Sequence, residues 1–283
     1  MLLCAVVGCT SNGDSYAPAT CADYPRVAFE SPGNLTLSTG GTVAVGLKCY
    51  LPDLPGSATW DVPSTARVSG DAVSAHAGAA KLVIEGLHAG TSTVEIVDGS
   101  HVYGALTITV KDFDHLTIPP DPETVPPNAS VVYANEADSR LGLALASSDG
   151  AVLRDDYEQV TLPPGISPGY GPGSFDVSAT PVGDYTVTAT SGTTTRSLQF
   201  TLVDHVDTLA LMTDAPAACF SATNGGRYVA NLKWTYTVDG ALAYGSANCI
   251  GIDASADTNH DGLLTIVATV DGLTTQVDVV PFH

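Results

Sequence analysis

Residues 86–96, GLHAGTSTVEI, and residues 106–110, LTITV, carry the pattern that decides the fold. Apolar and polar side chains alternate along both runs. The pair Asp98-Gly99 between them suits a tight turn, because both residues tolerate positive φ angles. Alternation with a period of two is typical of a strand that buries one face. The stretch therefore predicts an antiparallel hairpin at the end of a β domain.

Similar closing hairpins occur twice more along the chain. PVGDYTVTA at 181–189 is followed by LQFTLV at 198–203, and DGLLTIVA at 261–268 is followed by TQVDV at 275–279. These runs are rich in Val, Ile and Thr, and no segment shows a sustained helical period. Units of about 80–90 residues that end in the same way predict three small β-sandwiches in series.

Two joins between these units also resemble one another: DFDHL at 112–116 and VDHVD at 203–207. We therefore place domain 1 at 23–112, domain 2 at 113–203 and domain 3 at 204–283. Joins this short predict a semi-rigid rod of beads rather than loosely tethered modules.

The first unit resembles bacterial immunoglobulin-like domains of the group-2, invasin/intimin-like kind over about 85 residues. The residues that carry the resemblance are Gly40-Gly41-Thr42-Val43, Trp60, Ala66-Arg67-Val68 and Gly86-Leu87-His88-Ala89-Gly90-Thr91. The second and third units match this family only in their closing hairpins. The resemblance implies an all-β chain of three immunoglobulin-like antiparallel β-sandwiches in tandem.

The amino-acid composition limits the classes of function that the protein can have. The 283 residues include 30 acidic and 10 basic side chains, for a net charge of −20, while 44% are hydrophobic. So few basic groups cannot neutralise a phosphate backbone, which excludes nucleic acid as a partner. The hydrophobic content is too high for a disordered chain. The spread-out acid excess is typical of a solubility device that also protects strand edges.

The stretch Val6-Val7-Gly8-Cys9 resembles the lipobox of bacterial lipoproteins. The resemblance implies cleavage before Cys9, diacylglycerol and palmitate on this cysteine, and a lipid anchor as the one contact with the membrane. Residues 1–8 are then part of a signal peptide that begins upstream of Met1, and residues 9–22 form a short tether. Thr10 favours sorting to the outer membrane. An ordinary secretory signal and a chance apolar start are the alternatives.

Four further cysteines form two groups, Cys21 with Cys49 and Cys219 with Cys249, separated by 28 and 30 residues. There is no C-x-x-C pair, so a zinc site does not fit. Three disulfide connectivities are open, and local pairing within each group is the simplest if the ends are separate domains. Two structural disulfides indicate an oxidising compartment.

The segment DTNHDG at 257–262 fits the start of a calcium loop, with Asp253, Asp257, Asn259 and Asp261 as candidate oxygen ligands. The twelfth position of the loop is Ala268, so the usual bidentate Glu is absent. A polar turn before the next strand explains the segment equally simply, and we favour it. No other cofactor is predicted, and calcium stays an alternative.

Tyr170 lies within a Pro- and Gly-rich stretch at 162–173, where an exposed ring could stack against a sugar or a peptide. An irregular connection between strands is the simpler interpretation. Trp60 and Trp234 occur in alternating runs and are predicted to be core residues. The adjacent carboxylates Asp155 and Asp156, with Glu158 nearby, are expected to be solvated.

No catalytic motif is present: there is no G-x-S-x-G, no H-E-x-x-H, and no histidine pair at metal-ligand spacing. The sequence therefore predicts a non-enzymatic envelope lipoprotein, a surface binding, adhesion or spacer module with an envelope or extracellular protein or glycan as its partner. The alternative is a calcium-dependent adhesin or carbohydrate-binding protein that uses the loop at 257–262.

The lipid anchor can be tested by Cys9→Ser in the chain expressed from its natural locus. Serine cannot form the thioether to diacylglycerol, so we expect loss of palmitate labelling and release from the membrane fraction. Cys4→Ser is the matched control and should keep both properties. Undiminished palmitate incorporation in Cys9→Ser would show that the lipobox assignment is wrong.

Overall fold

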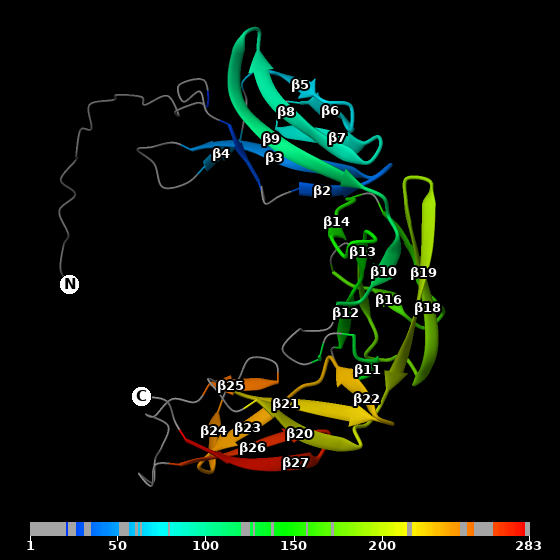
Figure 1. The fold of residues 1–283 in the computed structure, drawn as a ribbon, viewed down its shortest axis with the longest axis vertical. Coiled ribbons are helices and arrows are strands. Elements are labelled where there is room, and N and C mark those ends of the chain that lie inside the picture. The colour runs from blue at the N-terminus through cyan, green and yellow to red at the C-terminus, as the bar shows by residue number, and fades with distance from the viewer. Residues whose placement is uncertain are drawn as a thin grey trace, which may run out of the picture.

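The computed structural model describes residue 21 and the ranges 27–30, 35–50, 57–59, 62, 64–78, 80–119, 125–126, 128–136, 139–156, 158–170, 173–213, 217–243, 248–251 and 263–280. These residues are all-β and include no α-helix. Figure 1 shows three strand-rich regions that follow one another along an arc. We call them the N-terminal region (21–112), the middle region (113–203) and the C-terminal region (204–280).

The described residues of the N-terminal region form nine strands: β1 (Ala28–Phe29), β2 (Leu35–Ser38), β3 (Thr42–Tyr50), β4 (Ser57–Thr59), β5 (Thr65–Ser69), β6 (Val73–Ala77), β7 (Lys81–Gly86), β8 (Gly90–Asp98) and β9 (His101–Lys111). One sheet has the order β1-β3-β7-β6, with β4 also on β3, and the other has the order β2-β9-β8-β5. In immunoglobulin terms these are the A-B-E-D sheet and the C-F-G sheet, the latter extended by β2, which pairs in parallel with β9. The predicted hairpin is confirmed as β8 and β9.

The alternation in the sequence explains this sandwich. Along β7 the exposed and buried positions alternate strictly, and Leu82 and Ile84 point into the core. Ile96 of β8 and Ile108 of β9 bury the inner face of the other sheet, so the two sheets share one hydrophobic core. The predicted disulfide between Cys21 and Cys49 is present and lies in this core.

The middle region repeats the arrangement, and its described residues form ten strands, most of them short: β10 (His115–Thr117), β11 (Val131–Ala134), β12 (Arg140–Gly142), β13 (Ala144–Ala146), β14 (Val152–Leu153), β15 (Gln159–Thr161), β16 (Ser167–Pro168), β17 (Ser174–Asp176), β18 (Gly183–Ser191) and β19 (Thr194–Val203). Here β12 and β13 replace a single long strand. β13 pairs with β10 and β14, while β12 pairs with β17 and forms an edge of its sheet.

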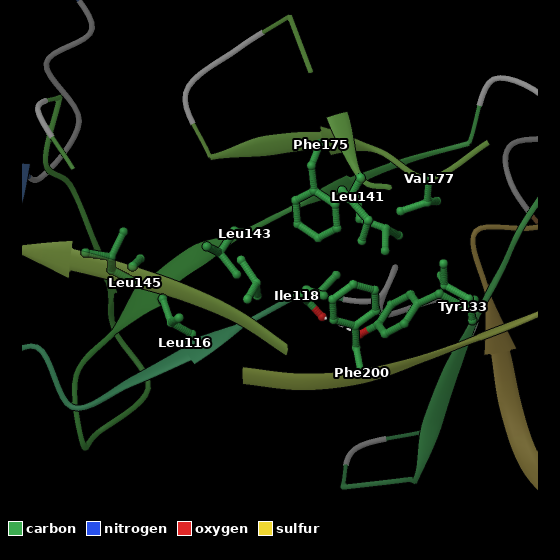
Figure 2. Close-up of a cluster of buried hydrophobic side chains, with 14 of the residues drawn as sticks. Leu116, Ile118, Tyr133, Leu141, Leu143, Leu145, Phe175, Val177 and Phe200 are labelled. Atoms are coloured by element: carbon green, nitrogen blue, oxygen red, sulfur yellow. Dashed lines mark hydrogen bonds between the residues drawn. The ribbon is translucent and has the colours of Figure 1, made fainter. Parts of the chain in front are cut away.

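Aromatic rings lie among aliphatic side chains in the core of the middle region (Figure 2). Phe175 of β17 and Phe200 of β19 enter it from opposite sides, with ring centroids 5.6 Å apart. The Tyr133 hydroxyl donates a 2.9 Å hydrogen bond to the Ile118 carbonyl, so its polar end is satisfied inside the core.

In the part of the C-terminal region that the structure describes there are eight strands: β20 (Thr208–Thr213), β21 (Ala217–Asn224), β22 (Arg227–Ala230), β23 (Thr235–Val238), β24 (Ala241–Ala243), β25 (Cys249–Gly251), β26 (Leu264–Val270) and β27 (Leu273–Val279). One sheet has the order β24-β23-β26-β27, closed by the third predicted hairpin. The other contains β20, β21 and β25. The predicted disulfide Cys219–Cys249 joins directly paired positions of β21 and β25.

One sheet continues from the middle region into the C-terminal region, which the sequence did not predict. β11 pairs in parallel with β19 on one side and with β22 on the other, so the strand order is β15-β18-β19-β11-β22-β21-β20. A separate hydrophobic core, which includes Val132, Val203, Val229 and Val270, covers this junction. The two regions are therefore packed together and are not beads joined by a linker.

The joint between the N-terminal and middle regions is polar. Asp155 accepts a 3.1 Å hydrogen bond from the Thr42 amide, and Asp156 accepts a 2.9 Å bond from the Ala44 amide. Ser191 donates to Asp155 (2.6 Å) and also contacts Ser38 across the joint. Asp155 is 7% exposed, so the prediction that it is solvated is wrong. The sequence could not show that the first region supplies amide donors to it.

Close backbone contact also fixes this joint. A Cβ atom added to Gly192, in the turn between β18 and β19, would lie 2.7 Å from the Cα atom of Gly40. Both glycines have positive φ angles, so each side of the contact requires a residue without a side chain.

Glu158 lies half-buried behind this carboxylate pair. Burial, with the charges of Asp155 and Asp156 added, raises the pKa of its carboxyl group to about 7. Arg154 forms its ion pair with Asp156 at 2.9 Å. Oε2 of Glu158 is buried without a hydrogen-bond partner among the described residues. The protonated form of Glu158 is therefore favoured by its surroundings.

Because the two regions share a sheet, a destabilising substitution in the middle region should also destabilise the C-terminal region. Val132 is fully buried at the junction, so Val132→Ala should lower the free energy of unfolding by about 2 kcal/mol. Native-state hydrogen exchange should also speed up at the amides of Val229 and Ala230. Val152→Ala, at a position 62% exposed, should change neither. Faster exchange confined to residues 131–134 would contradict the coupling.

Glu158 predicts a pH dependence of stability. Its pKa is raised from 4.5 to about 7 on folding, so the folded chain binds this proton more tightly than the unfolded chain. The stabilisation that this proton provides is complete below the unfolded pKa and is lost as the pH rises through 7. Glu158→Gln removes this dependence, so its melting temperature should rise relative to the wild type between pH 5 and pH 8.

The matched control for this comparison is Glu85→Gln, an exposed glutamate of β7, which should melt in parallel with the wild type across the same range. Thermal melts followed by circular dichroism at the two pH values give the comparison. A constant difference between Glu158→Gln and the wild type would rule out the raised pKa.

Candidate functional site

A cleft of about 240 Å³ lies where the middle and C-terminal regions meet. One wall is the edge strand β12 together with Ile118 and Pro119. The facing wall consists of β21 residues 220–222 and residues 229–232 with Trp234. Because β11 and β22 are hydrogen-bonded beside it, both walls are held in a fixed relation. The cleft is therefore formed by the fold itself, as is usual for ligand sites.

Arg140 of β12 is the cation of this cleft. Its guanidinium carbon lies 4.5 Å from the centroid of the Tyr170 ring, a cation–π contact that restricts where the side chain points. Asp176, opposite Arg140 in the strand pair, is engaged by the hydroxyl and amide of Ser178, which are the main cause of its lowered pKa. The described residues include no carboxylate that forms an ion pair with Arg140.

Asn231 brings a side-chain amide to the opposite wall. It follows the last residue of β22 with a φ of 64°, a left-handed conformation that Asn tolerates better than most residues. Its Nδ2 atom is buried and has no hydrogen-bond partner among the described residues. Such a donor is costly to leave unpaired, so a ligand acceptor would relieve it.

Aromatic rings form the apolar part of the cleft. Trp234 packs parallel to Tyr236, with an interplanar angle of 4°, and its ring centroid lies 6.2 Å from that of Phe220. Trp234 is partly buried between two hydrophobic cores, as predicted. Burial raises the pKa of Tyr133 to about 12, so its hydroxyl stays protonated beside the cleft.

The other predicted sites have mixed outcomes. Tyr170 is 91% exposed, as a stacking ring requires. Cys9 and Trp60, together with all four candidate calcium ligands, Asp253, Asp257, Asn259 and Asp261, lie outside the described residues. Within the described part of the chain, no group of three His, Cys, Asp or Glu side chains is placed to hold a metal ion. No helix there is long and apolar enough to cross a membrane.

Sequence reasoning missed Arg140 and Asn231, and it did not bring Trp234 together with them. Arg140 lies about 90 residues before Asn231 and Trp234 in the sequence, and they meet because β11 and β22 pair. One signal was available: VVYAN at 131–135 and RYVAN at 227–231 are similar short runs. In the structure these two runs contain the paired strands β11 and β22.

Comparison with known proteins gives only distant similarity. No family model matches the chain, and no curated protein matches it. Domains 5–6 of the S-layer protein SbsC are 15% identical, with a TM-score of 0.26, over 63% of this chain and 99% of that one.

Two other solved structures are similar over most of this chain. The Escherichia coli adhesin FdeC is 17% identical over 91% of this chain and 96% of that one, with a TM-score of 0.23. An endo-fucoidan hydrolase of glycoside hydrolase family 107 is 12% identical over 90% and 43%, with a TM-score of 0.23. All three scores are below 0.5, so these similarities carry no argument about function.

Proposed function

We propose that this chain is a non-catalytic binding module displayed at the bacterial cell surface, anchored by a lipid on Cys9, that engages an extracellular glycan or protein. The observation that carries the proposal is the cleft between β12 and the segment 229–234, where the middle region meets the sheet that continues into the C-terminal region. A preformed cleft needs no ordering of its walls when a ligand enters, which lowers the entropic cost of binding.

The chemistry of the cleft supports binding rather than catalysis. Among the described residues that line it, none is His, Cys, Asp, Glu or Lys. The Ser221 and Tyr133 hydroxyls therefore have no general base beside them within that lining. Arginine, an amide and aromatic rings are groups that orient a ligand without transferring protons.

Both disulfides support display outside the cytoplasm. Cys21–Cys49 and Cys219–Cys249 each close a loop of about 30 residues, and such bonds persist in oxidising compartments. The net charge of −20 supports solubility at an exposed location.

Gly142 of β12 gives a direct test, because a Cβ atom added there meets no heavy atom within 4 Å. The first atom of a larger side chain therefore fits on the cleft wall without a clash. We expect the full chain to bind at least one member of a glycan array or an array of bacterial and host surface proteins. Gly142→Trp should weaken that binding at least tenfold.

Gly251 of β25 is the matched control for this variant. Its added Cβ atom also meets nothing within 4 Å, and it does not line the cleft. Gly251→Trp should therefore bind as the wild type does, and equal melting temperatures will show that both variants fold. Full-strength binding by Gly142→Trp, or a wild-type chain that binds nothing on either array, would overturn the proposed function.

A further inference from the structure

The polar side chains that line the cleft differ in charge from the protein as a whole, which is strongly acidic. The chain carries 30 acidic and 10 basic side chains, yet no carboxylate belongs to the described lining. The Arg140 guanidinium and the Asn231 Nδ2 group can only donate hydrogen bonds. Donors that face a cleft without described acidic partners match a ligand that supplies acceptor oxygens.

Arg140 adds a requirement for negative charge. A guanidinium presents a planar fork of donors that fits a carboxylate with two parallel hydrogen bonds. Its contact with the Tyr170 ring holds it at the rim, so little side-chain freedom is lost when an anion binds. Asp176, opposite Arg140 in the strand pair, interacts with this charge but forms no ion pair with it, so an anionic ligand would be its direct partner.

Size and the aromatic wall determine the rest of the ligand. A cleft of 240 Å³ lies below the usual range of about 300–1,000 Å³ for drug-sized ligands, so it suits a group of roughly one ring. Phe220 is fully buried, so the partly buried Trp234 is the ring of the lining that offers a surface to the C–H face of a pyranose.

From these observations we infer that the cleft binds a carboxylate-bearing monosaccharide unit, of the uronic acid kind, within an extracellular glycan. Arg140 receives the carboxylate, Asn231 donates to a ring or hydroxyl oxygen, and the aromatic wall with Trp234 packs against the sugar ring. This inference rests on the proposed function and names the ligand class of the same cleft.

The test uses Trp234 as a reporter in the full chain. The sequence has two tryptophans, so Trp60→Phe leaves Trp234 as the single emitter. Methyl glucuronide, methyl glucoside and N-acetylglutamate are titrated separately, with fluorescence and calorimetry as readouts. We expect methyl glucuronide to bind at least tenfold more tightly than either of the other two compounds.

Two variants test the residue assignments. Asn231→Asp keeps a residue that tolerates the left-handed conformation and replaces the donor with a carboxylate, while Arg140→Gln removes the charge. Each should raise the dissociation constant for methyl glucuronide at least tenfold. The controls are Asn128→Asp, at an exposed residue with nearly the same φ of 65°, and Arg67→Gln in the N-terminal region. Both should bind as the parent does, and melting temperatures verify folding.

The outcomes separate the inference from the proposed function. Equal binding of methyl glucoside, or unchanged binding in Asn231→Asp and Arg140→Gln, would overturn the carboxylate requirement. Tighter binding of N-acetylglutamate would assign the cleft to an acidic peptide and overturn the sugar class. If none of the three compounds binds while Gly142→Trp still abolishes binding on the arrays, the inference falls and the proposed function stands.

Discussion

The parallel pairing of β11 with β22 is the constraint on which the relation between the middle and C-terminal regions depends. Its register is short, from Val131 opposite Tyr228 to Tyr133 opposite Ala230. Buried valines reinforce it: Val132, Val203 and Val229 each contribute about 1.5–3 kcal/mol through removal from water. That sum is comparable with the whole net stability of a typical domain, about 5–15 kcal/mol. The two regions are therefore expected to move as one body.

The two joints of the chain differ in the physics that holds them. The joint around β11 and β22 is covered by a cluster of buried apolar side chains. The joint between the N-terminal and middle regions uses Asp155 and Asp156 as acceptors for backbone amides, and the pKa of the nearby Glu158 is raised to about 7. Its strength depends on charge, so solution conditions can change the contact between these regions.

Sequence reasoning succeeded where the determinants are local. The three closing hairpins and both disulfides follow from alternation, from turn residues and from cysteines about 30 residues apart. At Asp271-Gly272, for example, both residues have positive φ angles, as such a turn requires. The division into three domains stays a prediction. Pairing of β11 with β22 joins segments almost a hundred residues apart, and no periodicity specifies a partner at that distance.

The cleft shows why a binding site cannot be recognised from the amino-acid composition. A net charge of −20 repels anions at long range, and taken alone it argues against an anionic ligand. Over the few ångströms of a binding contact, however, the groups that face the ligand decide the energy, because more distant charges are screened beyond about 8 Å at physiological salt. Arg140 and Asn231 face the cleft, and no described carboxylate joins them there. The acidic surface would then serve selectivity, since it penalises any anion that does not reach these two donors.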